Sequence, residues 1–505
     1  MAEKRLVAHL HTASPLFARL VRGTFWSVAA TGVVSAFNLL SGIICARILG
    51  TETFGQMGVL QSTVGFVGLL AGLGLGVTAT RFVARYVSSD LEKCGQMLGA
   101  ILLLGGGTIL AGSLGLLLGA GVVADRWLNC PELEMSLRIC SIWVFAFAAG
   151  ELLMAALAGL ESFRAVAAMS LLRGCLIFGG TIAGLKWGLN GSLVGWSLGL
   201  VASTLLLFRS LWRECAARGI RIGFTKSRED IRAIFSYAVP TLISGLSYAP
   251  FVWLTNTILV RNPHGFEQMA LLTVAYQWRG LFTYLPVSLS RVALPLISSS
   301  ESEGRDTTHH AFAVSNFLNQ LIVWCCGITL LGAAGILLTL YGEDFLSGRW
   351  AFMLVIGGVM VGFVGNSLGS MIQASGLFRM GIIGNLLSGV SLVGCTLLLG
   401  KQLGAVSVGI GSMLGYFLNL VYCASGLVQQ GHVEAKLGSK IVVTAVAAVI
   451  LVLLMAQMPA LWSAWVAVSL TPLAIWLLYN EFAKPAGISF DSLHKLIKKS
   501  FSEKS

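Results

Sequence analysis

Long apolar runs separated by short polar breaks make up most of this chain. The run ILLLGGGTILAGSLGLLLGAGVVA at residues 101–124 exceeds the roughly 20 residues with which an α-helix crosses a bilayer. Segments of about ten residues with alternating polarity, which would predict a membrane barrel, do not occur in the sequence. The pattern therefore predicts an all-α integral membrane protein.

Apolar runs read against charged or turn-forming breaks give fourteen candidate spans. They lie at residues 24–46, 57–80, 98–124, 139–160, 165–185, 190–208, 234–260, 268–290, 311–341, 350–375, 380–400, 404–427, 440–457 and 460–480. An even number places both termini on the same side of the membrane. The side of the termini carries 25 Lys and Arg residues and the opposite side carries 7, so the positive-inside rule predicts cytoplasmic termini.

The composition supports the membrane-protein class and limits the kinds of binding partner that we expect. The chain is 56% hydrophobic and 11% charged, whereas soluble domains carry roughly 25% charged residues. Its net charge of +12 therefore indicates topology and attraction to anionic membrane lipids, and we expect no nucleic-acid partner because no soluble basic domain is predicted. Most of the ten cysteines fall inside apolar spans without metal-ligand spacing, so we expect neither a metal site nor a cofactor.

Segments of the first half recur in order in the second half. RGTFWS (22–27) matches RAIFSY (232–237), FRAVAAMSLLRG (163–174) matches FRMGIIGNLLSG (378–389), and WGLNGSLVGWSLG (187–199) matches LGAVSVGIGSMLG (403–415). The offset drifts slowly from 210 to 216 residues, as small loop insertions produce. We interpret this as a duplication of six spans, and an even number keeps both copies in one orientation. A pseudo-two-fold axis along the membrane normal is then expected, as in transporters built from parallel repeats.

The duplication defines the predicted domain plan. It consists of a cytoplasmic N-terminus (1–23), an N-lobe (24–208), a cytoplasmic linker (209–233), a C-lobe (234–430), two added spans (431–482) and a cytoplasmic amphipathic tail (483–505).

Two ionisable residues inside the N-lobe spans are predicted to be neighbours. Glu151 lies eleven residues before the turn near residue 162, and Arg173 lies eleven residues after it. At 1.5 Å per residue both reach a depth of roughly 16 Å, so adjacent antiparallel helices bring them together. The pair is either a structural salt bridge or a cavity-facing charge that contacts an anionic substrate or a coupling ion.

Arg279, in VAYQWRGLFTYLP, has no acidic residue in the spans of its own lobe. A cation near mid-membrane without a counter-ion needs water or an anionic ligand, so we expect Arg279 to line a cavity. Its neighbours Tyr276, Gln277 and Trp278 are substrate-binding candidates because such side chains stack on sugars, and packing or interfacial anchoring is an equal claim.

Further candidates lie near the span ends and around the seventh and eighth spans. Arginines at cytoplasmic ends either contact lipid headgroups or gather a phosphate at the cavity mouth, since arginine binds phosphate bidentately; they are Arg22, Arg81, Arg85, Arg164 and Arg291. Spans one to six contain no proline, whereas Pro240, Pro250 and Pro286 lie in spans seven and eight. Proline frees backbone carbonyls and permits bending, so these three are hinge candidates.

The stretch ARILGTETFGQMGVLQSTVGFVGLLAGLGLGVTATRFVARY at 46–86 carries a family resemblance. It resembles the opening of polysaccharide exporters of the multidrug/oligosaccharidyl-lipid/polysaccharide (MOP) exporter superfamily, in particular the polysaccharide transporters and O-antigen (Wzx-type) flippases. The resemblance implies a MATE-like fold that works by alternating access. A polyprenyl-pyrophosphate-linked oligosaccharide, such as an O-antigen, capsule or exopolysaccharide repeat unit, would pass its head through the cavity. Related flippases bind the pyrophosphate with cavity arginines, for which this sequence offers Arg173 and Arg279.

The resemblance also implies a setting. The protein would be a monomer in the bacterial cytoplasmic (inner) membrane, in contact with membrane lipids and with the polysaccharide polymerase or chain-length machinery. Coupling to H⁺, to Na⁺ or to the membrane potential stays open.

Three other functions are weighed against this one. A multidrug cation antiporter of the MATE type usually needs a membrane-embedded acid, and here the sole mid-span acid, Glu151, has an arginine partner. A lipid II flippase also has fourteen spans, although the LGTETFG break looks more like the polysaccharide group. A membrane enzyme of polysaccharide assembly is disfavoured because the longest outward loop, 125–138, has only about 14 residues, and neither a phosphate-binding loop nor a nucleophile elbow occurs in the sequence. We therefore expect a secondary-type transporter rather than an enzyme.

Overall fold

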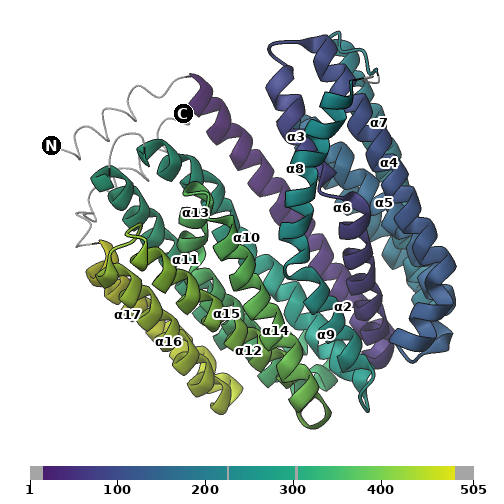
Figure 1. Cartoon of the computed structure of the whole chain (residues 1–505). Helices are drawn as coiled ribbons and strands as arrows, with labels where there is room; N and C mark the ends of the chain where they lie inside the picture. Colours follow the sequence, from purple (N-terminus) through teal and green to yellow (C-terminus); the bar gives the residue numbers. More distant parts are fainter. Residues whose placement is uncertain (1–14, 224–226, 302–304, 484–505) are drawn as a thin grey trace, which may run out of the picture. The chain divides into compact units, whose positions relative to one another are not determined.

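The computed structural model describes residues 15–223, 227–301 and 305–483, and it describes side chains for all of these except residues 15–31, 285, 288–301, 305–311, 460, 461 and 483. All regular structure in these ranges is helical (Figure 1). The long helices are α2 (Pro15–Gly72), α3 (Leu75–Tyr86), α4 (Leu91–Val122), α5 (Glu134–Gly159), α6 (Phe163–Gly184), α7 (Gly188–Ala217), α8 (Arg228–Leu246), α9 (Ala249–Val260), α10 (Gly265–Glu301), α11 (Arg305–Thr339), α12 (Arg349–Val364), α13 (Asn366–Ala374), α14 (Phe378–Leu403), α15 (Ala405–Gln429), α16 (Ala435–Gln457) and α17 (Ala460–Leu478). Short 3₁₀ or π turns occupy Val123–Trp127, Pro131–Leu133, Leu185–Trp187, Glu343–Gly348 and Tyr479–Ala483. The predicted amphipathic tail lies outside the described residues, apart from its first position.

The helices agree with the predicted spans. Eleven stretches of the described residues are long and apolar enough to cross a membrane, and two of them, 32–72 and 163–217, reach 41 and 55 residues. The stretch 32–72 covers parts of two predicted spans, the stretch 163–217 contains two predicted spans in full, and all fourteen predicted spans lie mainly on helix. The predicted all-α membrane class is confirmed.

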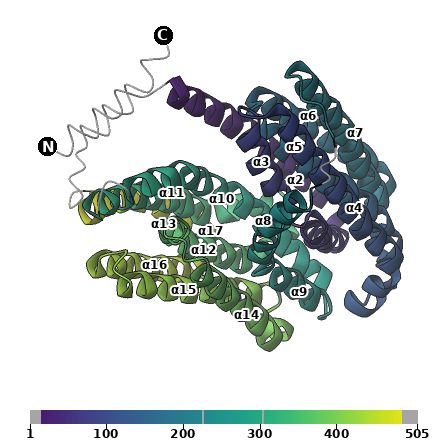
Figure 2. The same ribbon diagram turned by 45° about the horizontal axis from the view of Figure 1, so that its top comes forward.

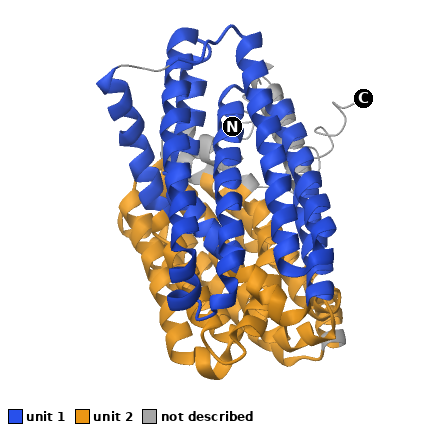
Figure 3. Ribbon diagram, turned by 90° about the vertical axis from the view of Figure 1, so that its right-hand side faces the viewer, with its two compact units in different colours: residues 1–49, 60–245 blue, residues 50–59, 246–505 orange. Residues whose placement is uncertain are grey.

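Packing divides the chain into two compact units (Figure 3). Unit 1 contains residues 1–49 and 60–245, and unit 2 contains residues 50–59 and 246–505. Relative to the predicted lobes, residues 50–59 pack in unit 2, and α8 packs in unit 1 as far as residue 245. The lobe boundaries themselves rest on the sequence duplication and remain a prediction.

Two glycines break helices where a side chain would be strained. Gly50 has φ 76° and ψ 175° and interrupts α2, which is otherwise helical over 58 residues. The predicted outer turn between the first two spans is thus reduced to one non-helical residue. Gly74, with φ 68°, precedes α3, and a Cβ atom there would lie 2.6 Å from the carbonyl oxygen of Ala238 in α8. Only glycine combines a left-handed backbone with this close approach.

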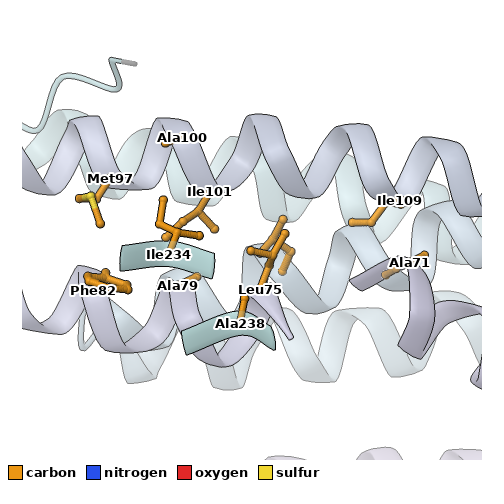
Figure 4. Packing of buried hydrophobic residues seen from close by; sticks show 12 residues of the cluster. Ala71, Leu75, Ala79, Phe82, Met97, Ala100, Ile101, Ile109, Ile234 and Ala238 are labelled. Carbon is orange, nitrogen blue, oxygen red and sulfur yellow. The ribbon is translucent and has the colours of Figure 1, made fainter. Parts of the chain in front are cut away.

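Buried apolar side chains from α3, α4 and α8 form the core of unit 1 beside this approach (Figure 4). Leu75 and Phe82 from α3 meet Met97 and Ile101 from α4, and Ile234 from α8 lies with them at 0% exposure. Inside a membrane such side chains stabilise the contact through close van der Waals packing rather than through removal from water. The first half of the seventh span is therefore anchored on the second and third spans.

Glycines also bring neighbouring helices into backbone contact. In α6 and α7, a Cβ atom at Gly180 would lie 2.2 Å from the carbonyl oxygen of Gly195, and one at Gly184 would lie 2.1 Å from that of Gly191. In α14 and α15, a Cβ atom at Gly415 would lie 2.7 Å from the carbonyl oxygen of Ser388. These two hairpins contain the duplicated sequence segments, and in both of them small residues let the helices approach closely.

The predicted linker, residues 209–233, is fixed to the start of α4. A Cβ atom at Gly95 would lie 2.0 Å from the carbonyl oxygen of Arg221, and the amide of Gly223 donates to the Gly95 carbonyl at 3.2 Å. Beyond this contact, Lys93 forms an ion pair with Asp230 in α8 at 2.6 Å. This part of the predicted linker therefore belongs to the packed body of unit 1.

The last two helices pack onto unit 2, α16 along α12 and α17 along α11 (Figures 1 and 2). Arg349 at the start of α12 donates from Nη2 to the carbonyl oxygen of Met455 at 3.2 Å and to Oγ of Ser463 at 3.3 Å. Arg349 therefore links the connection between α16 and α17 to the start of α12.

Candidate functional site

An open pocket of about 420 Å³ lies in unit 1 between α3 and α5. Gly76, Thr80 and Arg81 from α3 line it together with Val77, and Glu151 and Ala155 line it from α5. Thr80 Oγ1 donates to the Ala155 carbonyl at 2.9 Å, which joins the two helices at one edge. Gly76, which has no side chain, and the small Ala155 leave the space, and Arg81 and Glu151 place two charged groups in a pocket whose lining is otherwise mainly apolar.

Glu151 and Arg173 form the ion pair that their equal depth predicts. Arg173 Nη1 lies 2.7 Å from Glu151 Oε1, and the guanidinium also lies 5.5 Å from the ring centroid of Phe147. Their environments differ: the Arg173 side chain is 13% exposed, whereas that of Glu151 is 58% exposed. Arg173 is therefore held in place by its neighbours, while Glu151 faces the pocket. Whether the pair is structural or contacts a ligand stays a prediction.

Of the five arginines predicted near cytoplasmic ends, the structure describes the side chains of Arg81, Arg85 and Arg164, and their role in phosphate binding stays a prediction. Arg81 lines the pocket, and its Cζ atom lies 4.1 Å from the ring centroid of Tyr237 in α8. Arg85 is exposed with Cζ 5.6 Å from the ring centroid of Tyr86, and Arg164 is exposed. The side chains of Arg22 and Arg291 lie outside the described residues.

Arg279 lies in α10 of unit 2 and is partly buried. Its Cζ atom lies 5.5 Å from the ring centroid of Tyr276, and the phenol groups of Tyr416, Tyr248 and Tyr276 lie near enough to affect its charge. No carboxylate forms an ion pair with Arg279 within the part of the chain that the structure describes. The acid-free surroundings predicted from the sequence are therefore present in the fold. Aromatic faces stabilise such a cation without neutralising it.

The neighbours of Arg279 take different positions. Gln277 Oε1 accepts a hydrogen bond of 2.8 Å from the hydroxyl of Tyr341, which is only 1% exposed and packs beside Phe54 and Phe345. Trp278 is partly buried, with its ring nitrogen enclosed. Gln277 is thus engaged with the interior of unit 2, whereas Tyr276 shares the tyrosine cluster of Arg279. Binding roles for all three remain predictions.

Another group of polar side chains lies at the break between α12 and α13. This break, at Gly365, interrupts the predicted tenth span. Asn319 Nδ2 donates to the carbonyl of Phe363 at 2.6 Å, and Gln320 Nε2 donates to that of Val364 at 3.2 Å. Ser367 Oγ donates to Asn316 Oδ1 at 2.7 Å. The amides of α11 therefore satisfy backbone carbonyls that the break exposes, as irregular backbone inside a membrane requires.

The hinge candidates take different positions in their helices. Pro240 lies inside α8, Pro250 is in the first turn of α9 directly after the break at Ser247 and Tyr248, and Pro286 lies inside α10. The carbonyl of Pro286 accepts from Asn366 Nδ2 at 3.4 Å, which links α10 to the broken tenth span. Their role in motion remains a prediction.

Sequence reasoning missed Tyr248 and Tyr416. Both are neutral, so a search for ionisable residues inside spans passes over them, and they lie in different spans from Arg279. The tripeptide Tyr248-Ala249-Pro250 does indicate a helix boundary in the sequence. Proline is common in the first turn of a helix, so the residue just before such a turn often marks a break from the preceding helix.

The helical fold of this chain is shared with solved membrane transport proteins. A lipid II flippase, MurJ, in an inward closed conformation aligns with 91% of this chain and 99% of its own at 14% identity, with a TM-score of 0.68. An inward-facing multidrug resistance MATE family transporter of the MOP superfamily aligns with 80% of this chain and 96% of its own at 16% identity, with a TM-score of 0.64. At these identities the likeness establishes the shared fold.

Residues 20–301 match the family of polysaccharide biosynthesis proteins, and this chain belongs to that family. Two relatives carry the name EPS I polysaccharide export inner membrane protein EpsE. The one from Ralstonia nicotianae is 24% identical over 438 residues, which covers 83% of this chain and 95% of the relative. The one from Ralstonia solanacearum is 24% identical over 331 residues, covering 64% of this chain and 71% of the relative.

Proposed function

We propose that this chain is a flippase that moves a polyprenyl-pyrophosphate-linked oligosaccharide across the bacterial cytoplasmic membrane by alternating access. The hydrophilic head crosses the membrane through the protein while the lipid tail stays in the bilayer, and both termini face the cytoplasm. The protein acts as a transporter and makes or breaks no covalent bond in its substrate. Membership of the polysaccharide biosynthesis family and similarity to relatives named for polysaccharide export support this assignment.

Arg279 is the observation that carries the proposal. A guanidinium inside a membrane protein costs several kilocalories per mole unless it has a counter-ion, water or a ligand. Arg279 has no carboxylate partner among the described residues and is surrounded by phenols. Such a group attracts an anion with several oxygens, and guanidinium binds phosphate groups through two parallel hydrogen bonds. A pyrophosphate linkage fits this chemistry.

The charges of unit 1 disfavour the cation antiporter. Glu151 would have to be free to exchange a proton or Na⁺ for a cationic drug, but it lies 2.7 Å from Arg173. The pair is neutral as a whole, and Arg81 adds a positive charge to the same pocket. Both units therefore present surfaces that repel a cation and accept an anion.

The experiment replaces Arg279 with alanine in a strain whose polysaccharide export depends on this gene. We expect Arg279→Ala to abolish surface polysaccharide while the protein remains in the membrane at normal level, because the anion loses its main binding group. Arg261→Ala is the matched control, since Arg261 is an exposed loop arginine in the same unit. Normal polymer from Arg279→Ala would remove Arg279 from the mechanism and with it the proposal.

The same strains separate the competing functions. If the protein is a flippase for lipid-linked oligosaccharide, the unpolymerised lipid-linked substrate should accumulate when Arg279 is replaced, which extraction and mass spectrometry detect. Efflux of a cationic dye that is lost in the deletion strain would instead indicate the antiporter. Rescue of a strain depleted of its lipid II flippase would indicate that substrate.

A further inference from the structure

Three phenols and one guanidinium meet in unit 2 from different helices. Tyr248 directly precedes α9, Tyr276 and Arg279 lie one turn apart in α10, and Tyr416 lies in α15. The hydroxyl of Tyr248 donates to that of Tyr416 at 3.2 Å, with the ring centroids 6.1 Å apart. The hydroxyl of Tyr276 donates to Asn256 Oδ1 at 3.3 Å. All four of these side chains are partly rather than fully buried.

Both hydroxyl contacts are long. Hydrogen bonds between oxygen atoms are shortest and most frequent near 2.7–2.8 Å, and bonds to an ionised oxygen are shorter still and roughly twice as strong. A hydroxyl that donates at 3.2 Å therefore gains free energy when it turns to an anionic oxygen. The hydroxyl proton of Tyr416 has no acceptor among the described residues, so it is already free to donate.

The cluster thus holds more donors than acceptors. Arg279 offers up to five N–H groups, the tyrosines offer hydroxyl protons, and no carboxylate of the described residues lies among them. A single phosphate would occupy the guanidinium through two oxygens. A diphosphate has a second group of oxygens next to the first, which hydroxyl donors beside the guanidinium can reach.

We propose that the hydroxyls of Tyr248 and Tyr416 complete, with Arg279, a binding site for a diphosphate group, and that a bound diphosphate replaces the hydrogen bond between these two tyrosines. This inference rests on the proposed function and adds to it the residues that distinguish a diphosphate from a monophosphate. Two polar contacts fix the break between α8 and α9 to its neighbours: Tyr248 to Tyr416 in α15, and Ser247, which accepts from Asn385 in α14 at 2.8 Å. A bound diphosphate that accepts from both hydroxyls removes the direct contact between the break and α15.

The first test measures binding of inorganic pyrophosphate to the purified full-length protein in lipid nanodiscs by titration calorimetry. Tyr416→Phe and Tyr248→Phe keep the rings and remove only the hydroxyls. We expect each to weaken pyrophosphate binding by about 10- to 100-fold, the range of one hydrogen bond to a charged group, and to change binding of inorganic phosphate much less. Tyr422→Phe, on the same helix α15, is the matched control and should bind as the unmodified protein does.

Arg279→Gln separates the two levels of inference. Loss of pyrophosphate binding in Arg279→Gln together with weakening in both tyrosine variants supports the whole site. Loss in Arg279→Gln with unchanged affinity in both tyrosine variants overturns the role of the hydroxyls and leaves the proposed function standing. Unchanged affinity in Arg279→Gln overturns the anion site itself.

Hydrogen exchange gives a second readout that packing alone would not move. Pyrophosphate should speed amide exchange in peptides that span residues 243–250 of the unmodified protein, because the break loses its contact with α15. The Tyr248→Phe variant should already exchange faster without ligand and should respond little to it. Slower exchange on binding in the unmodified protein would overturn the release of the break.

Discussion

Gly179 and Gly180 are adjacent in α6 and should respond in opposite ways to the same substitution. A Cβ atom at Gly180 would lie 2.2 Å from the carbonyl oxygen of Gly195 in α7, whereas one at Gly179 meets nothing within 4 Å. Cβ atoms essentially never approach another heavy atom closer than 3.0 Å. Gly180→Ala must therefore push α6 and α7 apart by about 0.8 Å or more, whereas Gly179→Ala fills open space.

The size of the difference follows from this geometry. Overpacking of a close-packed interface costs about 1–3 kcal/mol, and the backbone oxygen of Gly195 cannot move aside as a flexible side chain would. At about 2–4 °C per kcal/mol for a folding unit of roughly 150–250 residues, the apparent melting temperature of Gly180→Ala should fall by about 2–12 °C. Gly179→Ala should leave it unchanged or raise it slightly, since alanine is favoured over glycine in helices by up to about 1 kcal/mol.

Thermal unfolding of the purified variants checks this, with intrinsic tryptophan fluorescence as the signal. Trp143 and Trp196 stack with ring centroids 4.4 Å apart, and Trp196 directly follows Gly195, so the fluorescence reports on the affected interface. Equal melting temperatures for the two variants, or a larger loss in Gly179→Ala, would refute the packing argument.

Two ion pairs give the remaining predictions. Glu151→Gln should lower stability by about 1–3 kcal/mol because it leaves the mostly buried Arg173 without its counter-ion. Arg173→Gln leaves the exposed Glu151 hydrated and should cost only about 0–1 kcal/mol. Equal losses of the two variants in thermal unfolding would contradict this asymmetry. Exchanging the two charges should preserve surface polysaccharide if the pair is structural, and loss at normal protein level would favour contact with the substrate or a coupling ion. Lys93→Ala and Asp230→Ala should each lower stability by at most about 1 kcal/mol, with a coupling energy of about 0.2–1 kcal/mol in a double-mutant cycle. A coupling energy near zero would show that this ion pair does not help to hold the linker.

The span positions could be predicted because one physical requirement dominates them. A chain segment inside a bilayer must satisfy its own backbone, so an apolar run of sufficient length can only be helix. For the same reason depth can be counted in residues, and the count placed Glu151 opposite Arg173, which lie 2.7 Å apart in the fold. Prediction works here because both residues belong to one hairpin with a short turn.

The breaks and the tyrosine cluster could not be predicted in the same way. The break at Gly365 between α12 and α13 is accommodated by Asn319 and Gln320, which donate to carbonyls 44 residues later in the chain. Apolar runs do not encode which spans are neighbours, so the meeting of Tyr248, Arg279 and Tyr416 depends on packing that periodicity alone does not reveal. The assignment of residues 50–59 to unit 2 has the same origin, because Gly58 fits against Thr273 through the shape of the two helices.

The absence of an acidic partner for Arg279 among the described residues has an electrical consequence. If Arg279 binds the diphosphate, the empty site carries one positive charge, and the loaded site carries about one negative charge, because a diphosphate diester brings two. A bacterial membrane is negative on its inner side, so its field pushes the loaded site outward and draws the empty site inward. Each elementary charge that crosses the whole field gains about 2.3 kcal/mol per 100 mV. The sign reversal at a single arginine would therefore let one membrane potential favour both halves of the transport cycle.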